Sequence, residues 1–164
     1  MENLNDKYII RGAKDIIRES CLQYGFRKAG NYWYRAHYGV AQAIHLDRRV
    51  VGKYPYYVEA AVDLLSRRDW ATQPFRVYRC RILIERATPL GESLLQALDP
   101  SKGLEGLDER PAVLRHILDD FIAGELDPVR QASDIVHCIS KRDENRAIIV
   151  TQGLRDELQS SATR

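Results

Sequence analysis

Histidines close to carboxylates are the residues in this sequence best suited to acid–base or metal chemistry. His45 and Asp47 are two residues apart on an expected strand, so their side chains would lie on the same face of a sheet. A histidine oriented by a carboxylate is able to act as a general base. The alternative interpretation is a polar pair on the sheet face that is turned away from the helices.

A second pair, His116 and Asp120, is four residues apart on an expected helix and shares one helix face. Two ligands are too few for a protein metal site, so this spacing favours an exposed ion pair. His137 and Cys138 are neighbours on a helix, where side chains diverge by about 100°, and this excludes a thiol–imidazole pair. We therefore predict no metal ligand among these residues.

Sequence motifs of known enzymes are absent. The chain contains no GxGxxG, GxxxxGK[ST], GxSxG or HExxH pattern. Its three cysteines, Cys21, Cys80 and Cys138, are widely spaced and form no CxxC pair, which indicates buried free thiols rather than disulfides. The sequence therefore predicts no catalytic residue and no cofactor.

Composition is typical of a folded domain. The 164 residues are 45% apolar and 29% charged, which predicts one α+β domain over residues 1–164 with its own core. The chain has no apolar run of the ~20 residues that a membrane helix needs, and its first residues lack the apolar stretch of a signal peptide. We expect a cytoplasmic protein without membrane contact.

The charge is unevenly distributed along the chain. Residues 1–86 carry a net charge of +7, and residues 87–164 carry −5. Seven of the nine tyrosines lie between Tyr24 and Tyr57, interleaved with arginine and lysine. This pattern fits simple packing of a sheet, a protein-binding face or a stacking platform for single-stranded nucleic acid.

Helical and alternating patterns give the element order. Apolar spacing predicts a helix over residues 6–24 that ends at Gly25. Four strands are expected at residues 32–35, 40–47, 57–64 and 76–86. Their short connections favour a mainly antiparallel meander.

The C-terminal half predicts three to four helices that cover one face of this sheet. The clearest begins near Asp108 and ends at Gly124, and its buried stripe is Leu114, Ile117, Leu118, Phe121 and Ile122. Residues 146–151 are open between helix and strand, because β-branched side chains favour a strand there.

One stretch resembles a known family. The matching residues are Leu22, Gly25, Phe26, Arg27, Lys28, Gly30, Asn31, Trp33, Tyr34, Arg35, Gly39, Val40, Gln42 and Ile44. This pattern resembles the bacterial family catalogued as domain of unknown function 4304. The resemblance implies an α+β fold with a meander and flanking helices, and it implies no established activity or catalytic residue. Small families of this kind often supply immunity proteins, which bind and block a toxin.

We therefore expect a protein-binding module of the immunity or antitoxin kind that neutralises a bacterial toxin by occlusion. The expected contact residues, exposed on two strand connections, are Tyr54, Tyr56, Arg67, Arg68 and Trp70. The alternatives are a nucleic-acid-binding module that uses the basic aromatic half, and a small enzyme with a dispersed site around His45 and Asp47. The chain is expected to be a monomer, or a homodimer formed through an exposed sheet edge.

Overall fold

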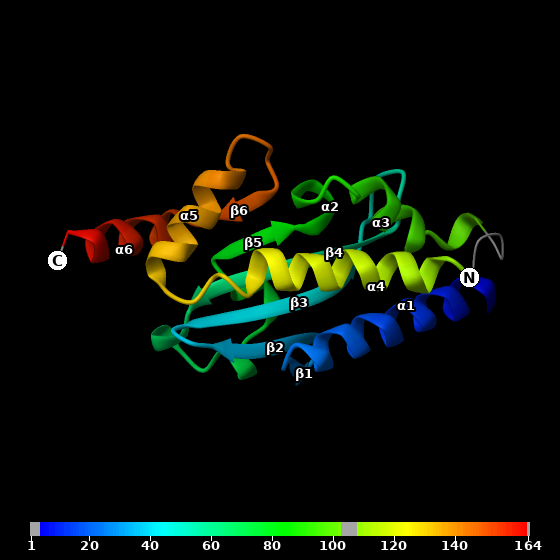
Figure 1. Ribbon diagram of the computed structural model, residues 1–164, viewed down its shortest axis with the longest axis horizontal. Helices are drawn as coiled ribbons and strands as arrows, with labels where there is room; N and C mark the ends of the chain where they lie inside the picture. The colour runs from blue at the N-terminus through cyan, green and yellow to red at the C-terminus, as the bar shows by residue number, and fades with distance from the viewer. Residues whose placement is uncertain (1–3, 103–107, 164) are drawn as a thin grey trace.

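The computed structural model of this chain describes residues 4–102 and 108–163 and has a mixed α+β fold around one antiparallel sheet. The six strands lie in sequential order across the sheet (Figure 1): β1 (Arg27–Ala29), β2 (Tyr32–His37), β3 (Val40–Arg48), β4 (Tyr56–Leu64), β5 (Cys80–Leu83) and β6 (Ile148–Val150). The predicted α+β class and antiparallel meander are confirmed. The predicted count of four strands is wrong.

The two additional strands form the two edges of the sheet. Gly30 has a φ of +61°, and this glycine turn brings β1 back onto β2. At the other edge, β6 pairs with β5, which places Val150 opposite Cys80. The open choice over residues 146–151 is thus resolved as a strand, in which three β-branched residues follow one another.

The last predicted strand, residues 76–86, is much shorter in the structure. A 3₁₀ turn, η3 (Phe75–Val77), precedes β5, and a short helix, α2 (Ile84–Ala87), follows it. The chain then folds back so tightly that a Cβ placed on Gly91 would lie 1.7 Å from the carbonyl oxygen of Glu85. Only a glycine permits this close approach.

In the described residues, six α-helices accompany the sheet: α1 (Leu4–Gln23), α2, α3 (Gly91–Ala97), α4 (Arg110–Phe121), α5 (Ala132–Arg142) and α6 (Gln152–Ala162). Helices α1 and α4 lie side by side across one face of the sheet, which we call the helix face (Figure 1). The predicted stripe of α4 is buried there with Ile17, Ile44 and Val62. Within the described ranges, every helix is too short or too polar to cross a membrane.

The opposite face of the sheet is covered by the chain between β4 and β5. This sheet-cover segment, residues 65–78, contains the 3₁₀ turns η1 (Leu65–Arg67), η2 (Trp70–Thr72) and η3. It contributes Trp70, Phe75 and Tyr78 to a second apolar cluster. The strand residues beneath them are the small Ala41, Ala43 and Ala61, which leave room for three large rings.

A buried polar network ties the sheet to the end of α4. Arg35 is 7% exposed and donates from Nε to Gln42 (2.9 Å) and from Nη2 to Asp127 (2.5 Å). Gln42 in turn donates to the carbonyl oxygens of Leu126 (2.7 Å) and Val129 (3.0 Å). Leu126 is the last residue of the π-helical turn η5 (Ile122–Leu126) and Val129 lies just beyond it, so Gln42 binds carbonyl oxygens at the end of this helix.

Candidate functional site

The five predicted contact residues do not form one surface. Tyr54 and Tyr56 lie at the start of β4, whereas Arg67, Arg68 and Trp70 follow its end. Strand β4 is nine residues long, so the two groups are separated by about 27 Å at the usual rise per residue. A single compact interface cannot be centred on both groups.

Two of these residues are buried. Tyr54 is 6% exposed and its hydroxyl donates to Glu92, and Trp70 is 0% exposed and donates from Nε1 to the carbonyl oxygen of Leu64 (2.8 Å). The prediction that Tyr54 and Trp70 are exposed anchors is therefore wrong. Trp70 stands in a polar stretch of sequence, but that stretch folds back over the sheet. The connection that carries Tyr54 exposes Val50 and Val51 instead.

Tyr56 is half-buried and packs against the core of the helix face. Arg67 and Arg68 are exposed, as predicted. The Nε of Arg67 lies 3.5 Å from a carboxylate oxygen of Glu157. The guanidinium of Arg68 lies 5.2 Å from the centre of the Trp70 ring, and it forms no ion pair with any carboxylate in the described part of the chain.

The segment that carries Arg67 and Arg68 begins at the same end of the sheet as Tyr38, a residue that the sequence did not single out. Tyr38 and Gly39 form the two-residue turn between β2 and β3. The carbonyl oxygen of Gly39 accepts from the backbone N–H of Leu65 (3.1 Å), and its N–H donates to the carbonyl of Arg130 (2.9 Å). The β2–β3 turn, the start of the sheet-cover segment and the α4–α5 connection therefore meet at one end of the sheet, at the left in Figure 1. We call this end, defined by Tyr38, Arg67, Arg68 and Arg130, the arginine–tyrosine surface.

Tyr38 is displayed in an unusual backbone conformation. Its φ is +54°, a region that residues other than glycine, asparagine and aspartate rarely adopt. Its side chain is 67% exposed. The guanidinium of Arg130 lies 4.6 Å from the centre of the Tyr38 ring, and the ring of His37 lies 4.9 Å away at a near-perpendicular angle. A non-glycine residue held at positive φ costs about 1–3 kcal/mol and is found preferentially at functional positions.

His45 belongs to a second polar group, on the sheet face away from α1 and α4. It is 8% exposed, its ring lies 4.7 Å from Phe75, and its Nδ1 is buried without a hydrogen-bond partner. Glu59 stands opposite on β4, is 3% exposed and lies 3.8 Å from Arg81. Asp47 accepts from the Tyr57 hydroxyl at 3.3 Å, and burial raises the pKa of Tyr57 to about 12.

This group resembles a buried polar layer more than an open active site. Three cavities of about 580, 190 and 270 Å³ lie beside or between helices, and none of these three is lined by His45 or Asp47. The placement of both residues away from the helices agrees with the alternative of a polar pair there. The enzyme hypothesis gains a histidine with a lowered pKa from this group, but none of these three cavities lies beside it.

His45 nevertheless predicts a pH dependence of stability. Burial lowers the pKa of His45 below its ordinary value of 6.5, so the unfolded chain takes up a proton first as the pH falls. Stability is therefore lost below about pH 6.5, by up to about 1.4 kcal/mol per pH unit for one proton. Replacing His45 by glutamine is expected to remove this loss, measured by urea unfolding at about pH 7 and about pH 5.5.

Glu59 acts in the opposite direction. Burial raises the pKa of Glu59 above 4.5, so the folded state takes up that proton first and stability rises as the pH falls through this lower window. Wild type and the His45→Gln variant share Glu59 and all the other histidines. The difference in their pH dependence of stability therefore isolates the contribution of His45. An equal loss of stability in both proteins would contradict this assignment.

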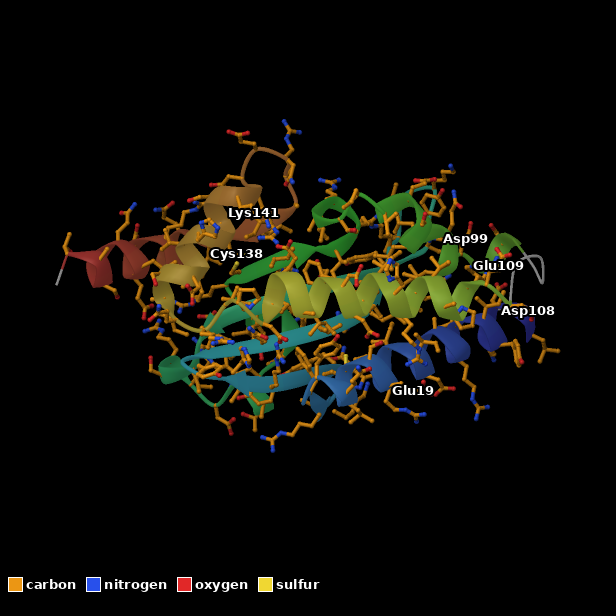
Figure 2. The ribbon with its side chains drawn as sticks, viewed as in Figure 1. Glu19, Asp99, Asp108, Glu109, Cys138 and Lys141 are labelled. Atoms are coloured by element: carbon orange, nitrogen blue, oxygen red, sulfur yellow. The ribbon has the colours of Figure 1, made fainter. Side chains whose placement is uncertain are left out.

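The remaining candidate groups are structural. His116 and Asp120 lie together on the exposed face of α4, as expected from their spacing, with 3.4 Å between Nε2 and Oδ2. Among the residues that the structure describes, no three His, Cys, Asp or Glu side chains lie close enough to hold a metal ion. The three cysteines are free and buried, as predicted. Cys138 and Lys141 both extend from α5 (Figure 2), and burial raises the pKa of Cys138 to about 11, which disfavours the reactive thiolate.

Comparisons with protein-family models, with curated proteins and with solved structures found no match for this chain. The resemblance of residues 22–44 to the domain of unknown function 4304 family stays a prediction. The structure assigns scaffold roles to several residues of that pattern. Arg35 and Gln42 form the buried network described above, Arg35 lies 4.5 Å from the centre of the Phe26 ring, and Lys28 lies 3.9 Å from the Trp33 ring.

Proposed function

We propose that this protein is a protein-binding module that occludes a surface of its partner with the arginine–tyrosine surface. The observation that carries the proposal is Tyr38, an aromatic side chain that is 67% exposed on a strained two-residue turn beside the exposed Arg130. Tyrosine and arginine are the residue types that most often dominate binding energy at protein interfaces. Strained residues of this kind cluster at functional sites, where the surrounding structure holds them in place.

The immunity-protein hypothesis adds that the partner is a toxin and that binding neutralises it. A preformed surface suits this role, because rigid anchors lose little conformational entropy on association. The β2–β3 turn is fixed by backbone hydrogen bonds to both Leu65 and Arg130, so Tyr38 stands on a supported turn. A homodimer through a sheet edge would have only β1 or β6 to use, each three residues long.

The nucleic-acid alternative has lost most of its expected stacking platform. Tyr32, Trp33 and Tyr34 are each at most 5% exposed, and Trp70 is buried beneath the sheet-cover segment. Bases stack on open aromatic faces, which these residues do not offer. What supports this alternative is the group of exposed arginines alone.

Replacing Tyr38 by glycine tests the proposal with two readouts of opposite sign. Glycine removes the strain at φ +54°, so the free energy of unfolding is expected to rise by about 0.5–1 kcal/mol. Binding is expected to weaken at least about 30-fold, as for loss of a hot-spot tyrosine. The measurements are urea unfolding, and a pull-down of the tagged full chain from its own host followed by titration of the recovered protein.

Arg146→Gly is the matched control. Arg146 is the other non-glycine residue with positive φ in the described part of the chain, at +55°, and it lies in the α5–β6 connection. This variant should also gain stability but should keep its partner. If Tyr38→Gly binds the partner as wild type does, the proposed function of this surface is wrong. Recovery of heterogeneous, nuclease-sensitive material would favour the nucleic-acid alternative instead.

A further inference from the structure

We infer that the partner is a protein that presents carboxylate groups to Arg68 and Arg130 of the arginine–tyrosine surface. This inference rests on the proposed function and adds the chemistry of the partner to it. It follows from how the two guanidinium groups are held, from the engagement of the nearby acidic residues and from the shape of the aromatic surface.

Each of the two guanidinium groups is held against an aromatic ring. Arg68 lies 5.2 Å from the centre of the Trp70 ring, and Trp70 is itself fixed by burial and by its bond to Leu64. Arg130 lies 4.6 Å from the centre of the Tyr38 ring, and its Nε donates to the carbonyl of Asp127 at 3.3 Å. A guanidinium held over a ring keeps in-plane N–H groups available at its edge, and that edge matches a carboxylate in a two-point contact.

The acidic residues around this surface are already engaged. Asp127 accepts from Arg35, Asp134 accepts from the backbone N–H groups of Arg130 and Gln131, and Asp69 accepts from the N–H of Ala71. Glu157 is shared between Arg79 and Arg67. Within the described residues, neither Arg68 nor Arg130 forms an ion pair. Their two positive charges are therefore available to carboxylates supplied by a partner.

The same geometry favours protein carboxylates over the phosphates of a nucleic acid. Arg130 covers part of the Tyr38 ring, and the neighbouring strand and cover aromatics Tyr32, Tyr34 and Trp70 are buried. A single-stranded nucleic acid would find phosphate contacts here but no row of open rings on which successive bases stack. A protein partner needs only a recess for the exposed part of Tyr38 and acidic residues at its rim.

The test replaces each arginine by lysine. Lysine keeps the positive charge but lacks the paired N–H groups that contact both oxygens of a carboxylate. With the protein recovered by the wild-type chain as probe, Arg68→Lys and Arg130→Lys are each expected to weaken binding about tenfold. The matched control is Arg86→Lys, because Arg86 is exposed in the last turn of α2, away from this surface. The association rate should also fall as salt is raised, because rim charges act mainly on encounter.

The outcomes separate this inference from the proposed function. If both lysine variants bind as wild type does while Tyr38→Gly does not bind, the inference is overturned and the function stands. If Tyr38→Gly binds normally, or no protein is recovered at all, the proposed function fails and the inference fails with it. If the lysine variants bind weakly but the recovered material is a nucleic acid, the groups recognised are phosphates and the inference is overturned.

Discussion

Alanine at Trp70 is expected to lower the free energy of unfolding by about 3–5 kcal/mol, the usual range for removing a fully buried tryptophan. Trp70 is 0% exposed and its ring lies 4.6 Å from the Tyr78 ring, above the small alanines of β3 and β4. The measurement is urea unfolding of wild type and variant at neutral pH.

Two further variants show whether the loss comes from packing. Trp70→Phe keeps much of the ring but loses the bond to the Leu64 carbonyl, so its cost should be smaller, about 1–2 kcal/mol. Arg67→Ala, in the same segment but exposed, should change stability by less than about 0.5 kcal/mol. A Trp70→Ala protein as stable as wild type would show that the sheet-cover segment does not pack as described.

Loss of the Asp63 carboxylate is the second large effect. Asp63 is 0% exposed, and it accepts from the backbone N–H (2.9 Å) and the guanidinium of Arg79, with a shortest side-chain distance of 2.6 Å. Arg79 also donates to Glu157 on α6 at 2.7 Å, so this group ties the last helix to the sheet. Asp63→Ala leaves Arg79 largely buried without its main partner, and the expected loss is about 3–5 kcal/mol.

A double variant distinguishes the loss of the ion pair itself from the cost of leaving Arg79 buried without its main partner. Replacing both Asp63 and Arg79 by leucine removes the charges together, and such replacements of a buried pair are often close to neutral. The double variant should therefore be more stable than Asp63→Ala in urea unfolding. If the double variant is the less stable of the two, the pair itself stabilises the fold rather than merely satisfying two buried charges.

The elements that could be predicted from sequence are those with a strong local signal. The stripe of α4 and the alternation of β3 and β4 are set by which residues must be buried, so periodicity indicates them directly. The edge strands are different. Strand β6 forms because Ile148–Val150 pairs with β5, some 70 residues earlier in the chain. No local sequence pattern predicts that pairing.

The candidate site could be predicted only in part, for the same reason. Arg67 and Arg68 are exposed because a charged pair in a polar connection is seldom buried. The expectation that Trp70 is exposed is wrong, because the same polar connection folds over the alanines of β3 and β4 and buries its ring. Tyr38 and Arg130 meet through the bond between Gly39 and the Arg130 carbonyl, which is a tertiary contact. The one local signal was a tyrosine placed before glycine in a two-residue turn, a position that favours glycine or asparagine.

Site-specific photo-cross-linking from position 38 tests the central claim most directly. A benzophenone side chain placed at Tyr38 in the full chain, expressed in its own host, is expected to cross-link to one protein, through a segment rich in aspartate and glutamate. The same group at Val51, which is 86% exposed at the opposite end of the sheet, is the control and should not capture that protein. Capture from position 51 alone, or from neither position while a partner still co-purifies, would contradict the account.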